Sequence, residues 1–380
     1  MRALHVITGL GVGGAEQQLR LLLRHLPAQC DVVTLTNPGP VAAGLTADGV
    51  RVTHLGMTGN RDLAALPRLT RLIREGGYDL VHTHLYRACL YGRLAARIAG
   101  VQTVVATEHS IGATRLEGRP HTARVRGLYL AGERLGHTTV AVSPTVAERL
   151  RHWGVPGQRI RVIPNGIDAP RFRYDAVLRR EARARHGLPE DAFVVGGVGR
   201  LAPGKRFDLL VQALALLPGD VWLLLVGGGR EETTLLRTAR DLGVAGRVVL
   251  AGERPYLPES RDEAPGLVAL LSAMDVLASP SPEESFGLAV VEALAAGLPV
   301  LYASCPAVED LPRDAAPAAR RVTGGAGAYA RELLRLRSAG PDERAVPDVV
   351  RHYDIARTAR QLMDLYTAAL SGSNLEVSPS

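Results

Sequence analysis

The chain has 380 residues, of which 46% are hydrophobic and 22% charged, and its formal net charge is +7 with histidine neutral. This length favours two hydrophobic cores, and dispersed basic residues with only 4% aromatic residues argue against a nucleic-acid-binding protein. No apolar run approaches the roughly 20 residues that span a bilayer, and the three cysteines lie far apart without a pairing or metal-binding spacing, which indicates a cytoplasmic protein.

The first part of the chain predicts strands that alternate with helices. Residues 3–8 form an expected strand, a glycine-rich turn follows, and leucines at helical spacing predict a helix up to Leu26. Alternation of this kind is typical of a parallel sheet with helices on both faces. Further strands are expected at 31–36, 50–55, 80–82, 103–107, 138–142 and 160–163, with helices at 62–74, 87–99, 122–135 and 144–153.

A second series of the same kind follows a break in the pattern. Residues 164–170 contain two prolines and a glycine, and a polar, arginine-rich stretch runs on to Glu190. We therefore expect a first Rossmann-like domain at 1–170 and a second at 171–353, which enclose a cleft at the carboxyl ends of their sheets. Strands are expected at 193–199, 222–226, 248–250 and 276–279, with helices at 206–217, 231–242, 267–273 and 286–296.

The end of the chain predicts one more helix and a tail. Residues 354–370 form an amphipathic pattern, and we expect this helix to pack back on the first domain. Residues 371–380 have the composition of a disordered tail.

The first glycine-rich turn allows an alternative function. Gly9, Gly11 and Gly14 satisfy the G-x-G-x-x-G pattern of dinucleotide-binding proteins. Such proteins carry an acid at the end of the second strand to bind the ribose, and this chain has Thr36 and Asn37 there. An NAD(P)-dependent oxidoreductase stays as an alternative that rests on these glycines alone.

Two glutamates flank the start of the predicted helix 286–296. Glu284 precedes this helix and Glu292 lies about two turns inside it. Eight helical residues span about 12 Å, which exceeds the separation of about 5–9.5 Å between the catalytic carboxylates of a glycoside hydrolase. The helix start between them favours an anion. A nucleoside diphosphate sugar fits, with Glu292 on the ribose and Glu284 on the sugar; the alternative is one exposed loop acid and one solvent-facing helix residue.

Two cations follow the first strand of the second domain. Arg200 and Lys205 lie at the carboxyl end of that strand, where both can reach the cleft. Of the 45 lysine and arginine residues, Lys205 is the only lysine. Two fixed cations beside a helix start would neutralise a pyrophosphate, including the charge that it gains as a leaving group. Solvated charges on a surface loop are the alternative.

These motifs occur in one order along the chain, together with Gly13-Gly14-Ala15-Glu16, Thr107-Glu108-His109 and the segment 162–168. As a set they resemble the retaining nucleotide-sugar glycosyltransferases of family 4, which have the GT-B fold, over about residues 1–300. The resemblance implies transfer of a sugar from a nucleoside diphosphate, most commonly UDP, with retention of anomeric configuration. The acceptor hydroxyl would belong to a glycan, a lipid-linked precursor or a natural-product precursor. A GT-B epimerase or a non-catalytic sugar-nucleotide-binding protein is the other alternative.

The resemblance also implies roles for the residues that would bind the donor. Arg200 and Lys205 would bind the diphosphate, and Glu292 would bind the ribose. Glu284 would hold the donor sugar and the β-phosphate together with the backbone of Phe286, Gly287 and Leu288.

Three residues of the first domain receive roles from the same resemblance. His109 would contact the transferring sugar near its anomeric carbon, and Gly13 and Gly14 would lie beside the phosphates and the acceptor. The family is expected to need no bound metal and no cofactor besides its donor. The departing phosphate oxygen is thought to deprotonate the acceptor, with Glu284 as an electrostatic support.

Some segments depart from the family pattern or stay open. The family usually has two glycines before an acid where this chain has residues 303–310, and the loop at 252–266 is long. His82 and His84 end a strand on the cleft side; we interpret them as polar lining for the acceptor, with structural histidines as the alternative. A metal site is not favoured, because the spacing shows no third ligand and no second shell. The arginine-rich region Arg119–Arg134 would allow weak peripheral membrane contact, with an ordinary solvated face as the alternative.

Overall fold

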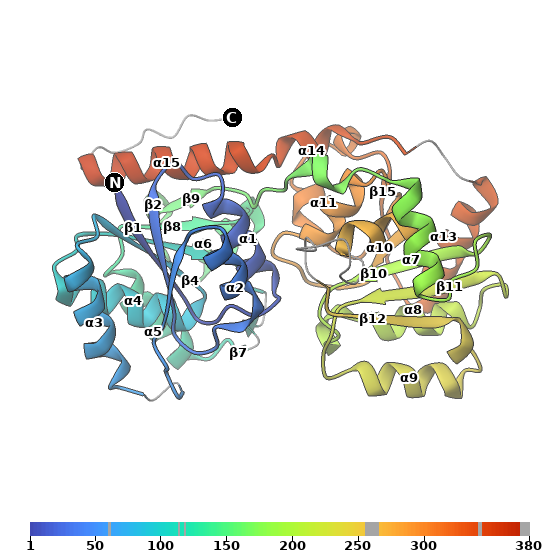
Figure 1. Ribbon diagram of the computed structural model, residues 1–380, viewed down its shortest axis with the longest axis horizontal. Helices are drawn as coiled ribbons and strands as arrows, with labels where there is room; N and C mark the ends of the chain where they lie inside the picture. Colours follow the sequence, from blue (N-terminus) through green and yellow to red (C-terminus); the bar gives the residue numbers. More distant parts are fainter. Residues whose placement is uncertain (60–61, 113–114, 118, 255–265, 341–343, 373–380) are drawn as a thin grey trace. The chain divides into compact units, whose positions relative to one another are not determined.

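The computed structural model describes the chain except residues 60–61, 113–114, 118, 255–265, 341–343 and 373–380 (Figure 1). The chain divides into two compact units, the first formed by Met1–Gly166 with Ile355–Ser380 and the second by Ile167–Asp354. The first unit ends inside the segment 164–170, where the strand–helix alternation of the sequence breaks. Most of the tail predicted at 371–380 lies outside the described residues.

The first unit is built on a seven-stranded parallel sheet with the order β3-β2-β1-β4-β5-β8-β9. Its strands are β1 (Arg2–Ile7), β2 (Gln29–Thr34), β3 (Arg51–His54), β4 (Leu80–His84), β5 (Thr103–Glu108), β8 (Thr138–Ala141) and β9 (Ile160–Val162). A two-stranded antiparallel ribbon, absent from the sequence-based expectation, is formed by β6 (Arg115–Leu116) and β7 (Arg119–Pro120). The helices are α1 (Gly14–Leu23), α2 (Gly39–Ala47), α3 (Ala65–Gly76), α4 (Tyr86–Ala99), α5 (Ala123–Glu133), α6 (Pro144–His152) and α15 (Ile355–Ser371).

Helices cover both faces of this sheet because its strands are apolar on both sides. Leu4 and Val6 of β1 belong to a core that includes residues of α3 and α4, whereas Ala3 belongs to a second core formed with α1 and α15. Figure 1 shows α15, in red, running along the sheet of the first unit, and α1 and α15 are in contact. The last helix of the chain therefore completes the core of the unit that contains the first strand.

The second unit has a six-stranded parallel sheet with the order β12-β11-β10-β13-β14-β15. Its strands are β10 (Phe193–Val198), β11 (Val221–Val226), β12 (Val248–Gly252), β13 (Val276–Ser279), β14 (Val300–Tyr302) and β15 (Ala319–Arg321). The helices are α7 (Ala176–Arg185), α8 (Phe207–Leu214), α9 (Glu232–Asp241), α10 (Leu267–Ala273), α11 (Leu288–Ala295), α12 (Pro306–Glu309), α13 (Ala326–Ala339) and α14 (Asp348–His352).

The arginine-rich stretch before Glu190 contains the helix α7, which the sequence analysis left as a break. Asp175 caps it, because the Asp175 carboxylate accepts hydrogen bonds from the backbone N–H groups of Val177 and Leu178. Arginine is also a good helix former. Two arginines of α7, Arg179 and Arg183, have specific partners, whereas Arg180 and Arg185 are exposed.

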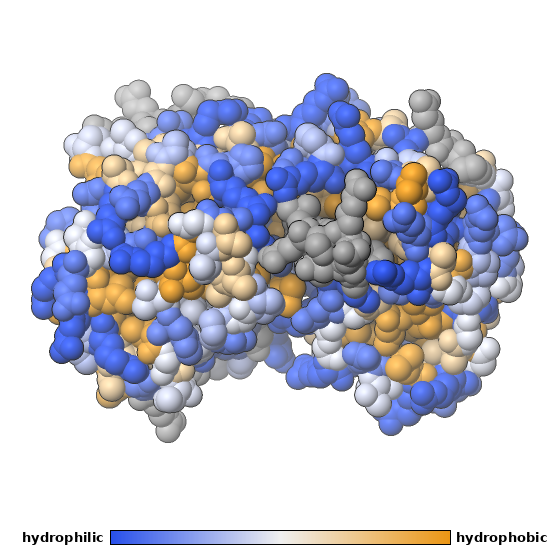
Figure 2. All heavy atoms as spheres, viewed as in Figure 1, coloured by the Kyte–Doolittle hydropathy of each residue, from blue (hydrophilic) through white to orange (hydrophobic). Residues whose placement is uncertain are grey.

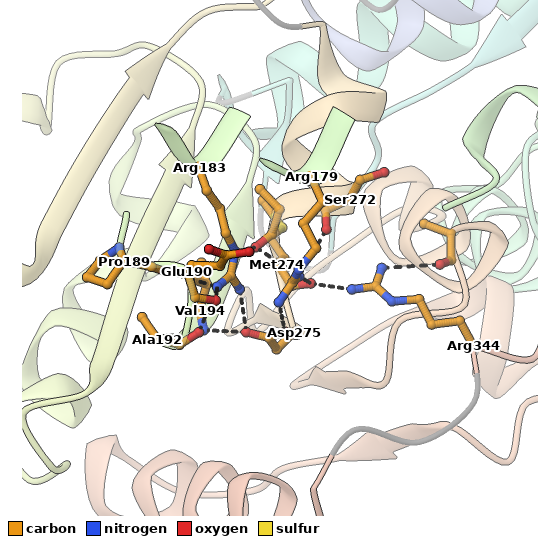
Figure 3. Close-up of polar contacts among 12 residues, drawn as sticks. Arg179, Arg183, Pro189, Glu190, Ala192, Val194, Ser272, Met274, Asp275 and Arg344 are labelled. Carbon is orange, nitrogen blue, oxygen red and sulfur yellow. Dashed lines mark hydrogen bonds and ion pairs between the residues drawn. The ribbon is translucent and has the colours of Figure 1, made fainter. Parts of the chain in front are cut away.

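A polar cluster joins α7 to the start of β13 (Figure 3). Arg179 and Arg183 donate to the two oxygens of Asp275 at 2.7 and 2.8 Å, and the Arg183 side chain is 3% exposed. Arg183 also donates to the backbone carbonyls of Ala273, Pro189, Glu190 and Ala192. The Asp275 carboxylate, which directly precedes β13, thus binds two arginines of α7, although α7 is distant from it in sequence.

The surface of both units mixes hydrophilic and hydrophobic residues on the face shown in Figure 2. In the region expected to allow membrane contact, Arg124 and Arg126 of α5 and its C-cap residue Arg134 are exposed, and Leu128 is 48% exposed. Among the described residues, no helix has both the length and the hydropathy needed to cross a bilayer.

Candidate active site

The loop after β10 brings its lysine to the loop after β13. Because β10 and β13 are neighbours in a parallel sheet, their carboxyl ends lie at the same edge. Lys205, in the short 3-10 helix Pro203–Lys205, donates to Glu284 with 2.5 Å between Nζ and Oε1. Arg200, in the same loop, is exposed. Two residues that lie 79 positions apart in sequence therefore form one charged pair.

A third loop, after β11, supports the loop that carries Lys205. The φ angles of Gly227 and Gly229 are 136° and 153°, and a Cβ atom added there would lie 2.0 and 2.3 Å from the carbonyl oxygens of Gly199 and Leu201. Only glycine allows this contact between the two backbones. The sequence analysis assigned no role to this Gly-Gly-Gly run; its position at the end of a strand was the available signal.

Ser281 links the loop before α11 to the lysine loop. Its side chain is buried, and Oγ lies 3.2 Å from the Gly204 carbonyl oxygen and 2.9 Å from that of Glu283. Phe286 is 4% exposed and meets the ring of Tyr353 edge to face, with 4.9 Å between centroids. The backbone of this loop is therefore fixed from both of its ends.

Helix α11 is shorter than predicted. It begins at Leu288, because Gly287 has a φ angle of 100° and stands at the N-cap, so the predicted start at residue 286 and end at 296 are wrong. The segment between Glu284 and Gly287 is not helical, and the estimate of about 12 Å for an all-helical segment does not apply. Glu292 is 4% exposed, so it is no solvent-facing helix residue, and Glu284 is ion-paired. The alternative of two solvated acids is excluded.

We expect Gly287→Ala to lower the free energy of unfolding of the second unit by about 2–4 kcal/mol. An added Cβ atom would lie 2.4 Å from Cys305 Sγ, and left-handed backbone conformation adds strain. Thermal unfolding measures the change. Gly204→Ala is the matched control, since nothing lies within 4 Å of its added Cβ and its φ angle is not positive. Equal melting temperatures for the two variants would contradict the role assigned to Gly287.

The glycines of the first unit lie at the start of α1. Gly13 is the N-cap residue and Gly14 is the first residue of the helix. A Cβ atom added to Gly13 would lie 2.3 Å from Glu16 Oε2, so the Glu16 side chain occupies the space above this turn. Because Glu16 is a flexible side chain that can move away and the φ angle of Gly13 is −79°, neither contact nor backbone conformation requires glycine here.

His109 directly follows β5 and is half-buried. Its Nε2 lies 3.1 Å from Nδ1 of His84. Burial lowers the pKa of His109 to about 4, so its imidazole is neutral at pH 7.

The expectation of polar lining for the His-x-His pair of β4 is wrong, and the structural alternative applies. His82 and His84 are each 1% exposed, and His82 lies 2.5 Å from the Tyr366 hydroxyl and 2.7 Å from Thr107 Oγ1, so it is a structural histidine rather than polar lining. The pair also has a third imidazole beside it, because His5 of β1 is paired in register with His82. One nitrogen from each of these three rings lies within 4.8 Å of the others.

A buried acid beside His109 received no role in the sequence analysis. Glu108 is 1% exposed, and its Oε1 accepts a hydrogen bond of 3.2 Å from the Ser110 backbone. Burial raises the pKa of Glu108 to about 8, and the nearby Glu117 carboxylate adds to this rise. The Glu108 carboxyl is therefore mostly protonated at pH 7.

Comparison with known proteins identifies the family. Residues 12–171 match the model of Glycosyltransferase Family 4, and residues 179–336 match that of Glycosyl transferases group 1. The structure of Anabaena Alr3699/HepE in complex with UDP and glucose superposes with a TM-score of 0.82 and 22% identity, over 97% of this chain and 100% of that chain. The chain belongs to the GT-B glycosyltransferases. Both family models are those of glycosyltransferases, so the comparisons do not favour the oxidoreductase alternative.

Relatives of this glycosyltransferase include the D-inositol 3-phosphate glycosyltransferases of Mycobacterium bovis and Mycobacterium tuberculosis. They are 31% identical to it over 331 residues, which cover 82% of this chain and 66% of those proteins. Sucrose-phosphate synthase from Thermosynechococcus elongatus superposes with a TM-score of 0.75 and 22% identity, over 98% of this chain and 100% of that chain. At that identity, the solved structures show the fold of this glycosyltransferase and not its substrates.

Proposed function

We propose that this glycosyltransferase transfers a sugar from a nucleoside diphosphate, with UDP as the first candidate, to an acceptor hydroxyl with retention of anomeric configuration. The observation that carries the proposal is the Lys205–Glu284 pair, which lies ahead of a helix that buries Glu292. Similar folds support UDP, because Anabaena HepE has been solved with UDP and with UDP-glucose.

The second unit would bind the donor. Arg200 and Lys205 would neutralise the diphosphate, and the backbone N–H groups of Phe286, Gly287 and Leu288 would donate to its β-phosphate. Glu292 would accept hydrogen bonds from the ribose hydroxyls, the role that the family resemblance implies for it. Glu284 keeps Lys205 in place and would bind the donor sugar.

The first unit would supply His109 to the sugar, and Gly13 and Gly14 to the phosphates and acceptor. A neutral His109 can bind a sugar hydroxyl without adding a charge. In the reaction, the bond between the anomeric carbon and the phosphate oxygen breaks while the acceptor oxygen bonds to that carbon on the same face. The released phosphate oxygen takes the acceptor proton. The cations of the second unit would stabilise the charge that develops on this phosphate, so the proposed reaction would need no bound metal.

The acceptor is proposed from the relatives' chemistry. The name of the mycobacterial relatives gives D-inositol 3-phosphate as their substrate, so a phosphorylated polyol is the first acceptor to test. We expect nucleoside diphosphate release from a UDP-sugar to depend on such an acceptor, and NMR of the product to show the anomeric configuration of the donor. Inversion would contradict retention. A bound donor that is epimerised, or that no acceptor consumes, would favour an epimerase or a binding protein.

We predict that Glu292→Ala raises the donor KM by about 10–150-fold with a small effect on kcat. A hydrogen bond to a charged group contributes about 1.5–3 kcal/mol, and the ribose is held equally in the ground and transition states. Steady-state kinetics over a range of donor concentrations measure the change. Glu232→Ala is the control, because this glutamate is exposed at the start of α9 in the same unit. An unchanged donor KM would remove Glu292 from the site.

A further inference from the structure

Three imidazoles of the first unit form a continuous hydrogen-bonded chain. Nδ1 of His5 lies 3.0 Å from Nε2 of His84, and Nδ1 of His84 lies 3.1 Å from Nε2 of His109. The three rings come from β1, from β4 and from the residue after β5, which are consecutive strands of the sheet. The chain therefore runs across the sheet and ends at the histidine proposed to contact the sugar.

All three rings are neutral at pH 7. Burial lowers the pKa of His5 to about 3 and that of His109 to about 4. Burial also lowers the pKa of His84 well below its ordinary value, and the neighbouring rings of His82, His5 and His109 add to this effect. Each ring thus carries one proton, and each has one donor nitrogen and one acceptor nitrogen.

Two hydrogen bonds among three neutral rings leave two arrangements of the protons. In one, every ring is protonated on Nδ1; in the other, every ring is protonated on Nε2. Any mixture would place two protons, or two lone pairs, in one of the two contacts. Every ring has the opposite tautomer in the second arrangement, and the net charge is the same in both. Converting one arrangement into the other needs a proton to leave one end of the chain and another to enter at the other end.

The nitrogens at the two ends of the chain are Nε2 of His5 and Nδ1 of His109. Both are buried and have no hydrogen-bond partner within the described parts of the structure. A buried polar atom without a partner costs about 1–3 kcal/mol. In either arrangement one end is a donor and the other an acceptor.

We propose that His5 and His84 are positioning residues, which fix the orientation and the tautomer of the His109 ring for its contact with the donor sugar. A sugar hydroxyl can itself donate or accept, so a neutral His109 of either tautomer can form a hydrogen bond with it without creating a charge. The role in catalysis rests on the proposed function, because it assumes that His109 contacts the sugar. The hydrogen-bonded chain of the three histidines does not depend on that assumption.

The first test is NMR of the full-length protein with 15N-labelled histidine, without any substrate. We expect neutral rings of one and the same tautomer at His5, His84 and His109, assigned by single His→Gln variants, and a coupling across the bond between His5 and His84. Different tautomers in the chain, or a charged ring in it, would overturn the proposal. Stoichiometric binding of added Zn²⁺ to these rings would also overturn it and would identify His5, His82 and His84 as a metal site instead.

The second test compares variants in the turnover of UDP-glucose. His5→Phe removes the partner of His84 Nε2, and we expect kcat to fall by about 10–100-fold, the loss typical of a residue that orients a functional histidine. The donor KM stays unchanged, because Lys205 and Glu292 are intact. His5→Gln keeps a side chain that can donate or accept and is expected to restore most of kcat.

His82→Phe is the matched control. This ring is equally buried and lies 5.1 Å from His5 and 4.2 Å from His84 between centroids, but its hydrogen bonds go to Thr107 and Tyr366. A loss of kcat confined to His5→Phe supports the proposal. Equal losses of kcat in both variants would overturn it, because they would show that the histidine rings contribute only packing. If UDP-glucose is not turned over at all, the proposed function fails in this assay. The NMR result still decides whether the hydrogen-bonded chain of histidines exists.

Discussion

Replacing Lys205 by alanine is expected to lower kcat for sugar transfer by about 10²–10³, the loss typical of one preorganised charge-stabilising group. The Lys205 ammonium is held 2.5 Å from Glu284 Oε1, so its position is set before a donor arrives. It would meet charge that grows on the departing phosphate, and it should therefore stabilise the transition state more than the bound donor. Single-turnover and steady-state kinetics together measure this loss.

Lys205→Arg separates charge from geometry. The guanidinium keeps the positive charge, but its planar donors differ from a compact ammonium, so we expect partial recovery of kcat. Turnover of Lys205→Ala at nearly the wild-type rate would show that the only lysine of the chain is accidental and that Arg200 suffices.

Asp275→Ala is expected to lower the free energy of unfolding of the second unit by about 3–5 kcal/mol. The substitution leaves Arg183, with its 3% exposed side chain, and Arg179 without their shared carboxylate, and removing one partner of a buried pair is costly. The backbone N–H of Val194 also loses its acceptor. These contacts are drawn in Figure 3.

Two features of the chain sharpen this measurement. Its two tryptophans, Trp153 and Trp222, lie in different units, so a Trp153→Phe background makes Trp222 fluorescence report denaturant unfolding of the second unit. Asp220→Ala is the control, because Asp220 pairs with the half-exposed Arg337 and exposed pairs contribute about 0–1 kcal/mol. A loss as small for Asp275→Ala as for Asp220→Ala would contradict the importance of the cluster.

The alternation of strands and helices could be predicted where the strands are apolar on both faces. Runs such as Phe193–Val198 and Val221–Val226 are recognisable because parallel strands are buried on both sides. The short strands β14 and β15 were not predicted, because three residues are too few to show a periodic pattern and β15 is partly exposed. Helix α7 was not predicted, because its arginines are typical of a solvated stretch and the sequence does not show that Asp275 lies beside two of them.

The site was predictable only where sequence position fixes a place at the end of a strand. This applies to Lys205 and Glu284, which follow neighbouring strands of the second sheet. It fails for the histidine chain, since His5 and His84 lie 79 residues apart and only the order β1-β4-β5 makes them neighbours. The buried state of Glu292 also depends on how α11 packs, which the apolar pattern around it does not specify.

Saturation-transfer NMR with UDP, GDP, ADP, dTDP and NAD tests most directly the claim that the protein binds the ribose of a nucleoside diphosphate through Glu292. The measurement shows which nucleotide the protein binds and requires no acceptor. We predict that a nucleoside diphosphate, UDP first among them, gives strong ribose signals with the wild-type protein and that Glu292→Ala abolishes them. Binding of NAD alone, or ribose signals that Glu292→Ala leaves unchanged, would contradict the proposed donor site.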